Sequence, residues 1–140
     1  MLKSLDISRA KYAYEKVSEI NKKNINKNYL SLVRSFPIMI HNNGYASAIA
    51  LLYSKKKING INEDNEYMQL YKHISEWLIE NQKIISKVDL MESITSKTNE
   101  EYKRLSNETM ALLIWLKRFA EGMISDECEK TSTNKTSISS

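Results

Sequence analysis

The stretch that decides the fold is residues 99–124, NEEYKRLSNETMALLIWLKRFAEGMI. Its apolar residues recur every three or four positions, which predicts one long helix. Glu100 and Glu101 fall in the first turn, where the helix dipole favours negative charge. Met110 and Ile114 lie opposite the main apolar stripe, so we expect this helix to be central in its domain and not packed on a partner. The stripe consists of Tyr102, Leu105, Thr109, Leu112, Leu113, Leu116, Ala120 and Met123.

Shorter helical patterns precede this stretch. The chain has only three Gly and one Pro, too few turn residues for a β-rich fold. We therefore predict an all-α, compact bundle of five or six helices. The expected helices run from about Ser4 or Asp6 to Lys23, from Asn28 onward, from Tyr45 to about Lys56, from a cap at Asn62 or Asp64 onward, and around Val88–Ser96.

Two local signals divide these helices. Pro37 lacks an amide hydrogen, which predicts a break or kink near Ser35–Phe36. Asn42-Asn43-Gly44 predicts a turn, because Asn and Gly tolerate positive φ. Residues 57–65 are expected to form a polar loop.

The sequence predicts a single helical domain over residues 1–125 and a disordered Ser/Thr-rich tail over residues 126–140. A single cysteine, Cys128, favours a reducing, intracellular setting. The longest apolar run, Met110–Leu116, is far shorter than the roughly 20 residues that span a bilayer. A cytoplasmic protein without membrane contact is expected.

Charge is divided along the chain. Residues 1–60 carry eleven Lys or Arg against three Asp or Glu, a net charge of +8, whereas residues 61–126 carry eight against twelve, a net charge of −4. A basic half attracts polyanions, and opposite halves favour head-to-tail contact between copies. The pattern predicts a binding or assembly subunit.

The first predicted helix concentrates this positive charge. Arg9, Tyr12, Lys16 and Lys23 fall within a strip of about 60° on its helical wheel, a pattern that suits a nucleic-acid backbone. The alternative is an ordinary solvated face supported by i,i+4 ion pairs. The strip is expected to face away from the buried stripe, which consists of Ile7, Ala10, Ala13, Tyr14, Val17 and Ile20.

No motif indicates an active site. The glycines are isolated, and His41 and His73 have no ligand at metal-binding spacing, so we expect no catalytic residue, metal, cofactor or small-molecule substrate. Most tyrosines lie at core spacing and are interpreted as structural, although a base-stacking platform is the alternative. A helix-turn-helix is excluded because the helix from Tyr45 has no Arg, Asn or Gln to contact base edges.

Four stretches together resemble a known family. The similarity covers about residues 5 to 124 and departs from the usual pattern at Tyr45 and Gly122. The chain resembles the small helical subunit of the type III-B CRISPR effector, the Cmr complex. The stretches are residues 9–13 (RAKYA), residues 35–38 (SFPI) with Asn43-Gly44, Tyr71 with residues 76–78 (EWL), and residues 113–121 (LIWLKRFAE).

The resemblance implies a role in RNA-guided antiviral defence. Small subunits of this family stack into a minor filament and hold the target RNA along the guide duplex, while other subunits carry out the chemistry. The expected partners are therefore sister subunits of the Cmr complex, further copies of this chain, and the guide RNA–target RNA duplex.

From charge placement we predict RNA contacts without base reading. Two alternatives remain: a purely structural protein–protein scaffold, and a small RNA-processing enzyme. The predicted RNA-binding residues are Arg9, Lys16, Arg34, Lys117 and Arg118, followed by Lys23 and Lys55.

Overall fold

The computed structural model describes residues 2–58, 61–62, 64–81 and 89–125. Within these ranges the chain forms six helices and one antiparallel pair of two-residue strands, which confirms the all-α prediction. The predicted tail, residues 126–140, lies outside the described residues, so the division at residue 125 stays a prediction. The elements are α1 (Leu2–Asn21), α2 (Asn26–Asn43), α3 (Tyr45–Lys55), β1 (Lys57–Ile58), β2 (Ile61–Asn62), α4 (Glu66–Glu80), α5 (Leu90–Thr95) and α6 (Asn99–Met123).

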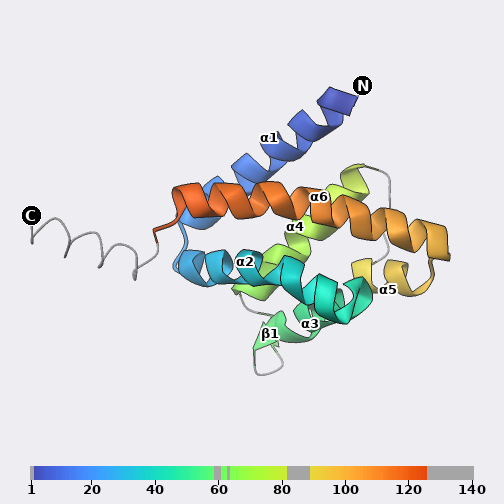
Figure 1. The fold of residues 1–140 in the computed structure, drawn as a ribbon. Coiled ribbons are helices and arrows are strands. Elements are labelled where there is room, and N and C mark those ends of the chain that lie inside the picture. Colours follow the sequence, from blue (N-terminus) through green and yellow to red (C-terminus); the bar gives the residue numbers. More distant parts are fainter. Residues whose placement is uncertain (1, 59–60, 63, 82–88, 126–140) are drawn as a thin grey trace, which may run out of the picture.

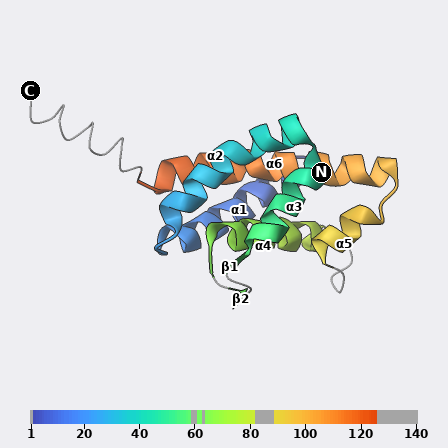
Figure 2. The ribbon, with the colours of Figure 1, turned by 90° about the horizontal axis from the view of Figure 1, so that it is seen from below.

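Helix α6 is the centre of the bundle. It packs against α1, α2 and α4, and Figures 1 and 2 show it running antiparallel to α2 while α1 crosses it. Helix α3 packs against α2, α4 and α5. The prediction that the last helix is central is therefore confirmed. Its fully buried apolar residues are Leu112, Leu113, Leu116 and Ala120, with Leu105 1% exposed.

The face that α1 buries differs from the predicted one. Ala13 and Val17 are fully buried as expected, but Ile7 and Tyr14 are 65% and 56% exposed. Tyr12, which was expected to face outward, is instead buried, and its hydroxyl donates a hydrogen bond to the His73 carbonyl at 2.7 Å. The predicted cationic strip of α1 thus borders the core, because α4 and α6 cover that side of the helix.

The second helix does not end at the proline. Helix α2 continues through Pro37 to Asn43, so a break at the proline is wrong, whereas the alternative, a kink, stays a prediction. Its anchoring in the core explains the continuity, because Phe36 before the proline is fully buried and Ile40 after it is 8% exposed. The predicted turn is confirmed, since Gly44 has a φ of 92° between α2 and α3.

The helix starts are only partly as predicted. Helix α2 begins at Asn26, two residues before the expected Asn28. Asn65, and not Asn62 or Asp64, caps α4, because its side chain accepts a hydrogen bond from the Met68 amide. The predicted polar loop contains the short β1–β2 pair.

Candidate nucleic-acid interface

The outer side of α4 carries an exposed lysine. Lys72 lies opposite Leu70 and Ile74 on the helix, and both of these are fully buried. The Lys72 amine has no carboxylate partner among the described residues. Lys72 therefore marks the outward face of α4.

Two lysines from α1 and the turn after it border this face. The Lys16 amine lies 3.6 Å from the Glu76 carboxylate and 5.4 Å from the centre of the Tyr12 ring. The Lys23 amine donates a hydrogen bond to Asp64, immediately before α4, at 2.8 Å. Both cations are thus held beside α4 by carboxylates.

Electrostatics show that Lys72 is close to these two lysines. The pKa of Asp64 is lowered because Gln69 and Lys23 donate hydrogen bonds to its carboxylate, and because Lys23 and Lys72 place positive charge nearby. The pKa of His73 is lowered to about 3, first by burial and then by the charges of Lys16, Lys72 and Lys23. Lys72 and Lys23 thus act on both Asp64 and His73, and Lys16 acts on His73 as well.

Two further lysines approach α4 from α3. Lys55 is the last residue of α3, and its amine lies 5.5 Å from the centre of the Tyr67 ring. Lys56 follows as the C-cap, with its amine 5.8 Å from the centre of the Tyr71 ring. Neither amine has a carboxylate partner in the described part of the chain. We call the group Lys16, Lys23, Lys55, Lys56 and Lys72 the lysine-bordered face of α4.

Arg9, the first of the predicted contacts, is engaged inside the protein. Its guanidinium donates two hydrogen bonds to Glu108, at 2.7 and 2.9 Å, and one to Asp6 at 3.3 Å. The pKa of Arg9 is raised chiefly by the bond to Glu108. A phosphate would have to compete with Glu108 for this group, so RNA contact by Arg9 stays a prediction.

The remaining predicted cations lie on α2 and α6. Arg34 lies 3.2 Å from Glu121, one turn beyond the half-buried Lys117. Arg118 is exposed on α6. Arg34 thus contacts α6, the helix that also carries Lys117 and Arg118. The structure thus brings together Lys16, Lys23 and Lys55 but leaves the other predicted cations apart.

The sequence prediction omits two members of the lysine-bordered face, Lys56 and Lys72. The helical wheel of residues 66–80 contains the signal for Lys72, because this lysine lies opposite the apolar stripe. Lys56 had no such signal, since its position depends on how α3 packs against α4.

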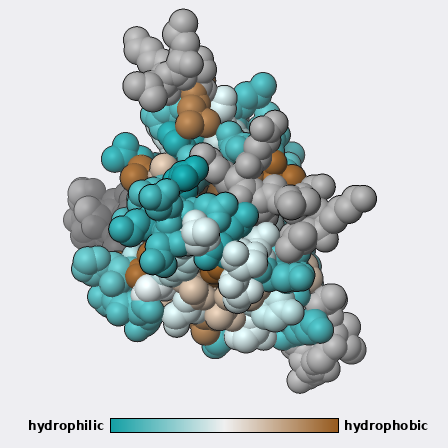
Figure 3. Space-filling model, turned by 90° about the vertical axis from the view of Figure 1, so that its right-hand side faces the viewer, coloured by the Kyte–Doolittle hydropathy of each residue, from teal (hydrophilic) through white to brown (hydrophobic). Residues whose placement is uncertain are grey.

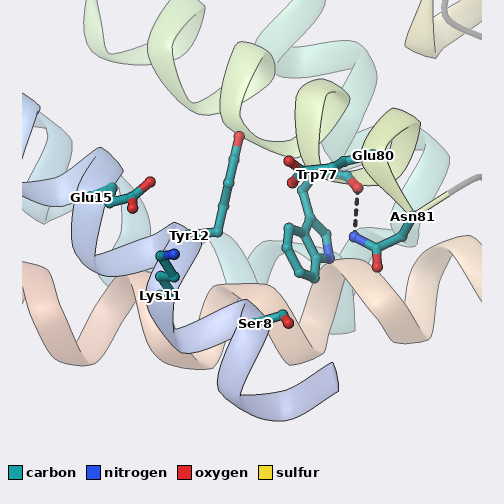
Figure 4. A pocket seen from close by; sticks show the side chains of 7 residues that line it. All are labelled: Ser8, Lys11, Tyr12, Glu15, Trp77, Glu80 and Asn81. Carbon is teal, nitrogen blue, oxygen red and sulfur yellow. Dashed lines mark hydrogen bonds between the residues drawn. The ribbon is translucent and has the colours of Figure 1, made fainter. Parts of the chain in front are cut away.

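A groove between α1 and α4 is acidic, in contrast to the lysine-bordered face of α4. Its volume is about 320 Å³, and Figure 4 shows the side chains of Tyr12 and Trp77 within it. Its charged lining residues are Glu15, Glu80 and Lys11, so acidic groups outnumber basic ones; neither carboxylate has an ion-pair partner among the described residues. Burial raises the pKa of Tyr12, and the nearby carboxylates Glu76 and Glu80 raise it further. The groove disfavours phosphate and suits a basic side chain.

The buried polar groups serve packing. Tyr29 and the Nδ1 atom of His73 share a 2.7 Å hydrogen bond inside the bundle.

Among the described residues there is no cluster of three or more His, Cys, Asp or Glu that could hold a metal ion. No helix in the described ranges is both long and apolar enough to cross a membrane.

The surface also lacks a broad apolar area on the side that Figure 3 presents. This side carries α5 and the start of α6, and its hydrophobic residues form small separate groups on a mainly hydrophilic surface. The fold and these features define the chain as a small all-helical protein whose distinguishing surface is a patch of lysines around one helix.

Comparisons with known proteins identify the family. The family model described as CRISPR-associated protein (Cas_Cmr5) matches residues 5–123. The fold is similar to the crystal structure of a Cmr5 family protein from Thermus thermophilus, with a TM-score of 0.68 and 23% sequence identity over 86% of this chain and 97% of that one. The chain belongs to the Cmr5 family, the small subunits of the type III-B Cmr complex, which confirms the predicted resemblance.

Proposed function

We propose that this chain is a non-catalytic, cytoplasmic subunit that holds the target RNA backbone along the guide duplex. The observation that carries the proposal is the lysine-bordered face of α4, where lysines from α1, α3 and α4 gather. Amines bind phosphate oxygens without reading bases, so sequence specificity would come from guide–target pairing.

The charge of this face sets the expected strength of binding. Asp64 and Glu76 partly neutralise Lys23 and Lys16, which leaves Lys55, Lys56 and Lys72 as the amines most available to phosphate. Few phosphate contacts give weak, salt-sensitive binding by a single copy. Stacked copies would add such contacts along one strand.

Head-to-tail stacking is the second part of the proposal. The groove carboxylates Glu15 and Glu80 lie toward the end of α4, whereas Lys23, Lys55, Lys56 and Lys72 border its first half; Lys16 lies between the two groups, beside Glu76. A copy whose ends differ in charge favours the contact of unlike ends. Basic side chains of a neighbouring subunit would enter the groove.

Charge reversal tests the RNA contact. The triple variant Lys55→Glu, Lys56→Glu, Lys72→Glu should weaken RNA retention by the reconstituted Cmr complex and lower the slope of log K against log salt by about 0.7 per lost contact. Lys103→Glu, on the exposed side of α6, is the single-charge control. Unchanged retention by the triple variant, in a complex that assembles normally, would reject the assignment.

A structural scaffold is the second candidate. Arg9, Lys23 and Arg34 each pair with a carboxylate from another part of the chain, which shows that some of the positive charge serves the fold itself. A scaffold predicts protein–protein crosslinks but no nucleotide adducts on this subunit.

An RNA-processing enzyme is the remaining alternative. Incubation of the purified chain with single-stranded RNA and a divalent metal tests it directly. We expect intact RNA; reproducible cleavage that follows the protein through purification would overturn the non-catalytic assignment.

A further inference from the structure

An accessible aromatic ring lies at the edge of the lysine-bordered face of α4. Tyr53, in the last turn of α3, is 45% exposed. The Lys56 amine lies 4.8 Å from the centre of its ring, and the ring of Tyr71 lies 5.9 Å away at an angle of 54°. Tyr53 therefore combines a solvent-accessible ring with a neighbouring amine that has no carboxylate partner in the described residues.

Packing explains the neighbouring tyrosine but not Tyr53. Tyr71 is 7% exposed, and its hydroxyl donates to Asp89 at 2.6 Å and accepts from the Met91 amide at 3.0 Å. These bonds fix the start of α5. Within the described part of the chain, the Tyr53 hydroxyl makes no hydrogen bond, and although Lys56 and Tyr71 contact the ring, 45% of the residue stays exposed.

We infer that Tyr53 stacks on an unpaired base of RNA bound to the lysine-bordered face, so that this face binds single-stranded RNA better than duplex. The inference rests on the phosphate contacts of the proposed function and applies to the target strand where it is not paired with the guide. Lysines contact the phosphates of both forms, whereas only an unpaired base exposes a face on which a tyrosine can stack. The amine of Lys56 is placed to contact a phosphate next to the stacked base.

Binding of labelled oligouridylate and of a blunt RNA duplex by the full chain at low salt tests the inference. Stacking of one base on an aromatic ring is worth about 1 kcal/mol or more, so Tyr53→Ala should weaken binding of the single strand about fivefold. Its binding of the duplex should be unchanged. Tyr53→Phe keeps the ring and should bind both RNAs as the wild type does.

A second tyrosine supplies the matched control. Tyr14 is 56% exposed but packs edge-on against Phe119, on the α1–α6 side of the bundle. Tyr14→Ala should leave the affinity for both RNAs unchanged. An equal loss with Tyr14→Ala would show that removal of any exposed ring weakens binding, and would overturn the inference.

The remaining outcomes separate this inference from the proposed function. If the lysine triple variant loses RNA but Tyr53→Ala binds both RNAs normally, only the stacking role fails. Tyr53→Ala that binds RNA normally but enters the Cmr complex poorly would assign Tyr53 to a protein contact instead. If the wild-type chain binds neither RNA at low salt, the proposed function itself is contradicted.

Discussion

Glu108 connects three helices through hydrogen bonds in the interior. Its side chain is 7% exposed and accepts bonds from Arg9 of α1 and from the Trp77 indole of α4 at 2.8 Å. Removal of the carboxylate leaves both donors without this acceptor in a largely dry environment. Breaking a buried pair of this kind is strongly destabilising.

We expect Glu108→Ala to lower the free energy of unfolding by about 3 kcal/mol, as measured by urea denaturation. Glu108→Gln keeps an oxygen acceptor and should lower the free energy of unfolding by a smaller amount. If Glu108→Ala lowers the free energy of unfolding by less than about 1 kcal/mol, the Arg9–Glu108 pair contributes little to stability. That result would strengthen the assignment of Arg9 to RNA binding.

His73 should make stability depend on pH. Its pKa is lowered to about 3 in the folded protein from 6.5, so as the pH falls from about 6.5 toward 3 the unfolded chain takes up a proton that the folded chain does not. Stability is therefore lost on acidification, by about 2 kcal/mol at pH 5 relative to neutral pH.

The variant His73→Gln does not titrate and retains an acceptor for the Tyr29 hydroxyl. Urea midpoints of wild type and variant across this range should converge as the pH falls. Parallel pH profiles would contradict a buried, neutral histidine.

At the residue scale, chemistry was easier to predict than partners. The interior position of the α6 stripe followed from residue types and spacing. The ion pairs of Arg9 and Arg34 did not, because Glu108 and Glu121 lie 99 and 87 residues away in sequence and meet them only in the folded bundle.

At the scale of the helix, α4 depends on the residue that caps its start, Asn65. Asn65 is 6% exposed; its Oδ1 atom accepts from the Met68 amide at 2.7 Å, and its Nδ2 atom donates to the Lys55 carbonyl at 3.1 Å. One side chain thus caps α4 and connects it to the end of α3. This connection positions the lysines that α3 contributes.

Asn65→Ala should therefore lower the free energy of unfolding by about 1 to 2 kcal/mol. Asn65→Asp keeps the capping oxygen but loses the donor to the Lys55 carbonyl. Its free energy of unfolding should therefore lie between those of the wild type and the alanine variant. Thermal or urea unfolding measures all three. An aspartate variant as unstable as the alanine variant would contradict a major contribution from capping.

The helices themselves were predictable, but not the side that each one buries. Periodicity predicted all six, and Gly44 was found because a positive φ favours glycine. For α1, however, apolar residues occur on two sides, and packing against α4 and α6 selected the side with Tyr12 over that with Ile7. A periodic pattern shows that a helix is amphipathic, but it does not decide between two such sides.

At the scale of the molecule, residues from the two charged halves of the sequence mix in space. Lys23, Lys55, Lys56 and Lys72 lie around the first half of α4, Lys16 pairs with Glu76 further along the helix, and Glu15 and Glu80 line the groove toward its other end. The predicted single set of seven cations is instead divided between this face, the α2–α6 side and the buried pair of Arg9. Only the packing of α3 against α4 could reveal that Lys56 lies on this side of α4.

Nucleotide crosslinking in the assembled complex tests the central proposal most directly. Ultraviolet irradiation of the reconstituted Cmr complex on target RNA, followed by mass spectrometry of this subunit, maps the residues that touch the strand. The account predicts nucleotide adducts on segments that contain Lys55, Lys56 and Lys72, and none on the groove residues Glu15 and Glu80. Protein–protein crosslinks without nucleotide adducts, or adducts confined to surfaces away from α4, would contradict it.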